Sequence, residues 1–144
     1  MRMKAIVVEG NTDYIVIKSL FPSLEGQGIM VRIAQGSSNV FAVAKALNDY
    51  GYKVMVVLDT DSDKPGFDKR PFIQNRWDIG LTGRDIEVVW MDPYIEKVLG
   101  RVVPDLKNGK NKRIRSFDYL LERYKDGILG LVEFKKLKEF IENG

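Results

Sequence analysis

An apolar run that ends in closely spaced carboxylates constrains this chain more than any other feature. Residues 56–58 (Val-Val-Leu) lead directly into Asp59, Asp61 and Asp63. Such a run is typical of a buried strand, and side chains just past the C-terminal end of a strand lie where open α/β sheets bind their ligands. The pattern therefore predicts an α/β domain with a site at this strand end, and the three acids indicate a metal ion.

A second strand is predicted to end in the same way. Residues 5–8 (Ala-Ile-Val-Val) run into Glu9, and Asp13 follows one helical turn later. If the two strands are parallel neighbours, Glu9, Asp59 and Asp61 converge at one edge of the sheet. Oxygen ligands without nitrogen or sulfur suit Mg²⁺ or Mn²⁺ better than zinc or copper.

The absence of cysteine and histidine excludes several kinds of chemistry. The 144 residues contain neither type, which rules out disulfides, thiolate nucleophiles, Ser-His-Asp triads and zinc fingers. The length is that of one domain. No apolar stretch approaches the roughly 20 residues that span a bilayer, and no signal-peptide pattern is present. We therefore expect a cytoplasmic protein without a membrane segment.

Hydrophobic periodicity and turn residues predict the order of the elements. The resulting fold class is α/β, with a mainly parallel sheet of about four strands, helices on both faces and a helical C-terminal extension. The stretch 62–83 has weak periodicity and predicts only an irregular helical segment. Strands are expected over 4–8, 29–33, 53–58 and 85–90, helices over 12–20, 40–50, 94–99, 116–124 and 130–142, and a turn over 125–127.

Two of these motifs resemble a known family. Glu-Gly-Asn-Thr-Asp at 9–13 and Asp-Thr-Asp at 59–61 resemble the signature of the Toprim domain, and the surrounding residues look closest to the Toprim half of the overcoming-lysogenization-defect (OLD) family nucleases. The resemblance extends from residue 4 to about 99. It implies a Rossmann-like Toprim fold, with residues 1–100 as the metal-binding part and 101–144 as a basic loop and helical extension packed on the same domain.

The resemblance also implies an activity and a set of site residues. The activity is Mg²⁺- or Mn²⁺-dependent cleavage of phosphodiester bonds in DNA or RNA, for which two divalent ions supply a reactive water and charge stabilisation. Glu9, Asp59 and Asp61 are the implied catalytic residues and metal ligands. Asp13 and Glu96 are implied as further metal ligands, with Asp92 as the substitute for Glu96. Glu9 could bind metal or act as a general acid or base.

Charge is distributed unevenly along the chain. Residues 1–96 carry 11 Lys and Arg against 13 Asp and Glu, whereas residues 97–144 carry 12 against 7. A basic half beside an acidic half fits a polyanionic substrate, although a solvated basic face explains the charge equally well. In OLD nucleases a lysine beyond the last metal-binding acid stabilises the transition state, and the resemblance offers Lys107, Lys110 and Lys112 as candidates for it. Contacts to the phosphate backbone, or a solvated loop, are the more common roles of such residues. The candidates for nucleic-acid binding are Lys107, Lys110, Lys112, Arg113 and Arg115.

Three alternative interpretations compete with that of a nuclease. A calcium loop of the EF-hand type would need Gly and Glu where Lys64 and Arg70 stand, so that reading fails. A haloacid-dehalogenase-type phosphatase also carries Asp-x-Asp after a strand, but Asp63 stands where Thr or Val is usual. A non-catalytic nucleic-acid-binding module, or a subunit of a larger complex, stays open. The sequence has no Gly-x-x-x-x-Gly-Lys-Ser/Thr loop, which leaves an ATPase partner or a homo-oligomer as further alternatives.

Overall fold

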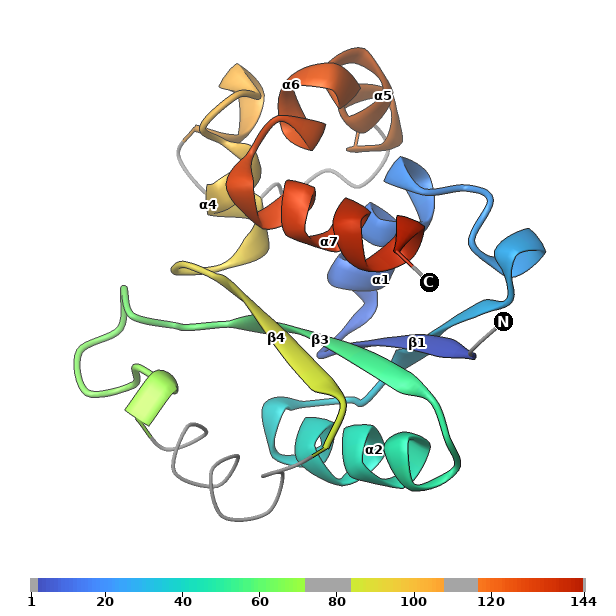
Figure 1. The fold of residues 1–144 in the computed structure, drawn as a ribbon. Helices are drawn as coiled ribbons and strands as arrows, with labels where there is room; N and C mark the ends of the chain where they lie inside the picture. The colour runs from blue at the N-terminus through green and yellow to red at the C-terminus, as the bar shows by residue number, and fades with distance from the viewer. Residues whose placement is uncertain (1–2, 72–83, 108–116, 144) are drawn as a thin grey trace.

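The computed structural model describes residues 3–71, 84–107 and 117–143. It contains one parallel four-stranded sheet in the order β2-β1-β3-β4 (Figure 1). The predicted parallel α/β sheet is thus confirmed. Its strands are β1 (Lys4–Val8), β2 (Ile29–Ile33), β3 (Lys53–Asp59) and β4 (Ile86–Met91).

The two central strands are apolar because they are covered on both faces. All five residues of β1 are buried, as are residues 54–58 of β3, and near-continuous β-branched runs are what a two-sided parallel sheet requires. Val8 pairs with Val57 in the register of these strands. Glu9 follows β1 directly and Asp59 ends β3, so the two acids reach the same edge of the sheet.

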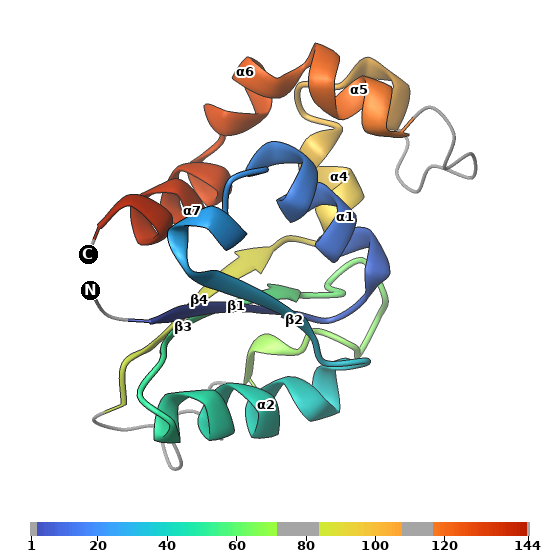
Figure 2. The same ribbon diagram turned by 90° about the vertical axis from the view of Figure 1, so that its right-hand side faces the viewer.

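Helices cover both faces of the sheet (Figure 2). Helix α2 (Ser37–Asp49) lies against one face, and α1 (Asn11–Leu20) and α7 (Val132–Glu142) lie against the other, with α5 and α6 packed beyond them. No helix in the described ranges is long and apolar enough to cross a membrane. The helices are α1 (Asn11–Leu20), α2 (Ser37–Asp49), α4 (Ile95–Leu99), α5 (Phe117–Arg123), α6 (Lys125–Leu129) and α7 (Val132–Glu142), with short 3₁₀ turns at η1 (Glu25–Gln27) and η2 (Pro104–Leu106).

Several helical predictions differ from the structure, among them the last helix, which begins at Val132 rather than at residue 130. Helix α2 begins at Ser37 rather than at residue 40. Residues 125–127, predicted as a turn, form the start of α6, because the fully buried Ile128 anchors this segment in the core and tertiary packing overrides the turn preference of Asp and Gly. The irregular helical segment predicted over 62–83 lies largely outside the described residues.

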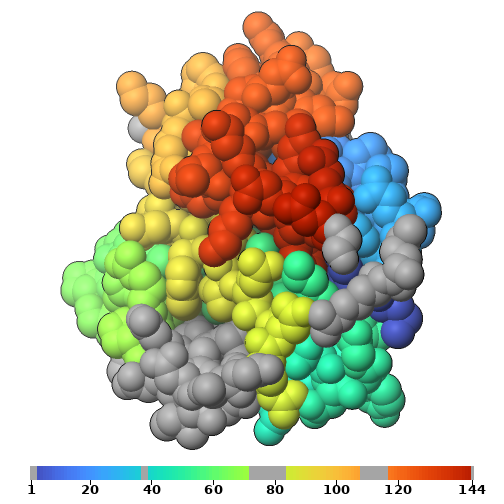
Figure 3. Space-filling model, in the orientation of Figure 1, coloured from blue at the N-terminus to red at the C-terminus, as the bar shows by residue number. Residues whose placement is uncertain are grey.

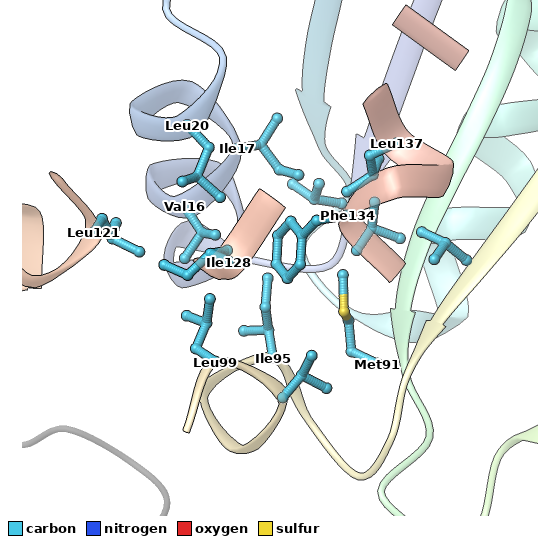
Figure 4. Close-up of a cluster of buried hydrophobic side chains, with 14 of the residues drawn as sticks. Val16, Ile17, Leu20, Met91, Ile95, Leu99, Leu121, Ile128, Phe134 and Leu137 are labelled. Carbon is cyan, nitrogen blue, oxygen red and sulfur yellow. The ribbon is translucent and has the colours of Figure 1, made fainter. Parts of the chain in front are cut away.

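A single large hydrophobic cluster joins the sheet to the C-terminal helices. The fully buried ring of Phe134 on α7 lies among Ile17 of α1, Met91 of β4 and Ile95 of α4 (Figure 4). The space-filling view shows the C-terminal helices massed directly above β4 (Figure 3). The cluster contains residues from both sides of residue 100. The division into parts 1–100 and 101–144 stays a prediction.

A buried lysine joins the first strand to the last helix. Lys4 is only 5% exposed, and its Nζ donates to the carbonyl oxygens of Phe140 at 2.7 Å and Ile141 at 3.2 Å. These carbonyls belong to the last turn of α7, where helical carbonyls lack intrahelical donors. A cation at this end is also favoured by the helix dipole.

Candidate metal centre

Three carboxylates meet at the C-terminal edge of the sheet. Glu9 follows β1, Asp13 lies in the first turn of α1, and Asp59 ends β3. One oxygen from each lies within 4.8 Å of the others. Together with Glu96 and residues 10–12 at the start of α1 they line a cavity of about 270 Å³. In Figure 2 the strands run toward the side of the molecule at which α1 begins.

Backbone donors hold two of these carboxylates in place. Asp13 accepts a hydrogen bond from the N–H of Gly10 at 3.2 Å, which also caps α1. Asp59 Oδ1 accepts one from the N–H of Ile95 at 3.1 Å, at the first residue of α4. Both acids are therefore held by backbone N–H groups at the starts of helices, and these helices begin close to the strand ends.

The acids are costly to ionise without a cation. Burial, followed by repulsion from Glu9, raises the pKa of Asp13 to about 7. Burial, followed by repulsion from Asp13, Glu9 and Glu96, raises the pKa of Asp59 to about 8. Burial also raises the pKa of Glu9. A divalent ion would offset this repulsion, and a set of carboxylate oxygens is the donor set that Mg²⁺ and Mn²⁺ prefer. The residues present therefore fit such an ion.

A lysine that the sequence analysis missed lies beside this cluster. Lys69 Nζ is 2.8 Å from Glu9 Oε1 and 2.8 Å from Asp61 Oδ2. Burial lowers the pKa of Lys69, but its hydrogen bonds to Asp61 and Glu9 outweigh this effect and raise it. The loop that carries Lys69 folds back so that its N–H donates to the Thr60 carbonyl at 2.9 Å. The spacing of residues in the sequence does not predict that this loop folds back onto the end of β3.

The remaining predicted acids occupy different positions. Asp61 adopts a left-handed conformation with φ of 57° and pairs with Lys69, outside the three-carboxylate cluster. Asp92 accepts hydrogen bonds from the hydroxyl groups of Ser62 and Thr60, which lower its pKa. Asp92 therefore anchors the loop after β3, whereas Glu96 lines the cavity, as its role as the preferred candidate requires.

The predicted nucleic-acid contacts fall mostly beyond the described ranges. Lys107 is exposed, and its carbonyl accepts a hydrogen bond from Lys97 Nζ at 3.0 Å. The other candidates, Lys110, Lys112, Arg113 and Arg115, lie outside the residues that the structure describes.

Comparison with known proteins identifies the domain type. Residues 3–61 match the family model described as "Overcoming lysogenization defect protein-like, TOPRIM domain", a span that contains Glu9, Asp13, Asp59 and Asp61. No curated protein and no solved structure matches the chain. Toprim domains bind divalent metals through acidic residues and take part in nucleic-acid processing, and the cluster of Glu9, Asp13 and Asp59 is compatible with both properties. The match over residues 3–61 and the parallel α/β architecture together support a Toprim domain related to that of the overcoming-lysogenization-defect proteins.

Proposed function

We propose that this protein is a nuclease that cleaves phosphodiester bonds in DNA or RNA with Mg²⁺ or Mn²⁺. The observation that carries the proposal is the convergence of Glu9, Asp13 and Asp59 from three different elements into one cavity. Their ionisation there is costly, and sites that hold charge at such cost are more often functional than structural. The related Toprim domain adds the expectation of a nucleic-acid substrate.

Glu9, Asp13 and Asp59 would hold the metal, with Glu96 beside them in the cavity wall. When bound, a divalent ion supplies Lewis-acid stabilisation of a phosphate and lowers the pKa of water. We assign Glu9 to metal binding rather than to proton transfer, because one of its oxygens lies within 4.8 Å of carboxylate oxygens of both Asp13 and Asp59. Asp61, the other predicted catalytic acid, adjoins this set through the same lysine.

The basic residues that follow the Toprim motifs are proposed to hold the substrate. Lys107 and the four further cations up to residue 115 carry positive charge that the backbone phosphates of either polymer would attract. This part of the proposal is independent of the metal centre, since phosphate contacts position a nucleic acid without performing the chemistry.

The first experiment is a cleavage assay on supercoiled plasmid, single-stranded DNA and structured RNA, each with Mg²⁺, Mn²⁺ or EDTA. Asp59→Asn removes a central carboxylate, and Asp63→Asn is the matched control because Asp63 is exposed in the same loop. We expect metal-dependent cleavage by wild type and Asp63→Asn and a loss of at least about 100-fold in Asp59→Asn.

Two results would contradict the proposal. If Asp59→Asn still cleaves nucleic acid, the carboxylate centre does not take part in the reaction. If no substrate is cut while wild type and Asp59→Asn bind nucleic acid equally, with affinity that falls steeply with salt, the protein is a non-catalytic binding module.

A further inference from the structure

One ammonium group occupies the flank of the carboxylate cluster. Lys69 Nζ contacts Glu9 Oε1 and Asp61 Oδ2, each at 2.8 Å, which is the distance of charge-assisted hydrogen bonds. The three side chains are only 20%, 13% and 23% exposed, respectively. In contrast, the surface pair of Lys18 and Glu25 involves a glutamate that is 84% exposed. The Lys69 contacts are therefore part of the interior of the site.

Glu9 is shared between two groups of charges. It belongs to the cluster with Asp13 and Asp59, and it also forms the ion pair with Lys69. A centre with two divalent ions holds them about 3.5–4 Å apart, so a second ion would need further carboxylate oxygens directly beside the first set. Here the Glu9–Asp61 pair, which a second ion would require, already holds a positive charge.

The loop that carries Lys69 is tied to both neighbouring strand ends. The Lys69 N–H donates to the Thr60 carbonyl at 2.9 Å, and the Asp61 N–H donates to the Pro93 carbonyl at 2.9 Å. The Thr60 hydroxyl donates to Asp92 at 2.6 Å. These hydrogen bonds fix the backbone of the loop, and the fixed backbone holds the Lys69 side chain against Glu9.

We propose that the Lys69 ammonium is the second cation of this centre, so that the site takes up one divalent ion per chain, at Glu9, Asp13 and Asp59, instead of two. This inference rests on the metal centre of the proposed function. A tethered ammonium differs from an ion in two respects: a chelator cannot remove it, and it offers hydrogen-bond donors in place of open coordination positions. Lys69 thus supplies permanent positive charge beside the ion.

The test is the number of Mn²⁺ ions bound, measured by titration with electron paramagnetic resonance of free Mn²⁺ and by calorimetry. Lys69→Met removes the charge and keeps most of the side-chain volume. Lys64→Met is the control, because Lys64 is exposed in the same loop. We expect one Mn²⁺ per chain in wild type and Lys64→Met, two in Lys69→Met, and one again in Lys69→Arg and in the double variant Lys69→Met/Asp61→Asn.

The outcomes separate this inference from the function on which it rests. Two ions in wild type, or one ion in a folded Lys69→Met, would overturn the inference and leave the metal centre intact. No Mn²⁺ binding by wild type would overturn the metal centre itself. Circular dichroism checks that each variant is folded, and Lys69→Gln gives the same comparison if the methionine variant does not fold.

Discussion

Replacing Asp59 with Asn measures how much the free energy of unfolding is lowered by an ionised carboxylate beside other acids at the end of β3. The pKa of Asp59 is raised from 3.8 to about 8, mainly by burial and then by Asp13, Glu9 and Glu96. Between these two pH values the folded chain keeps a proton that the unfolded chain releases. This tighter binding of the proton by the folded chain stabilises it fully below about pH 4. The stabilisation is lost as the pH rises toward 8, where Asp59 ionises in the folded chain as well.

The size of this effect follows from the shift. One pKa unit corresponds to about 1.4 kcal/mol, so a shift of this size corresponds to about 5–6 kcal/mol above pH 8. Part of the repulsion is relieved when Asp13 and Glu9 take up protons in turn, so we expect Asp59→Asn to stabilise the metal-free protein by about 2–3 kcal/mol at pH 8. Asn is neutral at every pH, and its side-chain oxygen can keep the hydrogen bond from the Ile95 N–H.

Thermal unfolding in EDTA at pH 5, 6, 7 and 8 provides the assay. For a chain of this length the expected gain corresponds to a rise in Tm of about 6–12 °C at pH 8, and to a smaller one at pH 5. With saturating Mn²⁺ the order should reverse, because only wild type keeps the full set of ligands. Asp63→Asn controls for the removal of an exposed acid. The reasoning is refuted if Asp59→Asn is no more stable than Asp63→Asn in EDTA, or if the difference between them does not grow with pH.

Three further predictions concern metal affinity and the fold. The affinity of wild type for Mn²⁺ should rise from pH 6 to pH 8, because Asp13 and Asp59, with pKa values of about 7 and about 8, must lose protons to bind; calorimetry that shows no pH dependence would contradict this. Lys4→Met should lower the free energy of unfolding in urea by about 1–3 kcal/mol, since it leaves carbonyls at the end of α7 without their donor; an unchanged midpoint would argue against that bond. Gly100→Ala should cost about 1–3 kcal/mol in the same assay because its Cβ would clash with a carbonyl oxygen of η2, whereas Gly26→Ala, which meets nothing within 4 Å, should have little effect.

Local patterns predicted the sheet well because each strand carries its own signal. The strands over 4–8 and 29–33 have the predicted bounds, β3 extends one residue beyond its predicted end, and β4 is shifted by one residue at both ends. Apolar β-branched runs between turn residues are local features of the chain. The turn predicted over 125–127 was wrong because burial of Ile128, a contact with distant residues, decided the conformation there.

The sequence by itself determined that acids would meet at one edge of a parallel sheet. Glu9 directly follows β1 and Asp59 is the last residue of β3, and parallel pairing of these adjacent strands brings both acids to the same edge of the sheet. The match to the Toprim family covers residues 3–61, a span that contains both acidic motifs. Each motif is a short run of neighbouring residues, so it can be recognised without knowledge of the fold.

Only the tertiary structure decided which charges share the site. It left Asp61 outside the cluster of Glu9, Asp13 and Asp59, placed Lys69 between Glu9 and Asp61, and tied Asp92 to the loop after β3. These contacts depend on a loop that folds back on a strand end and on backbone hydrogen bonds across it. Such contacts join residues of no fixed separation, and for that reason no periodicity or spacing in the sequence announced them.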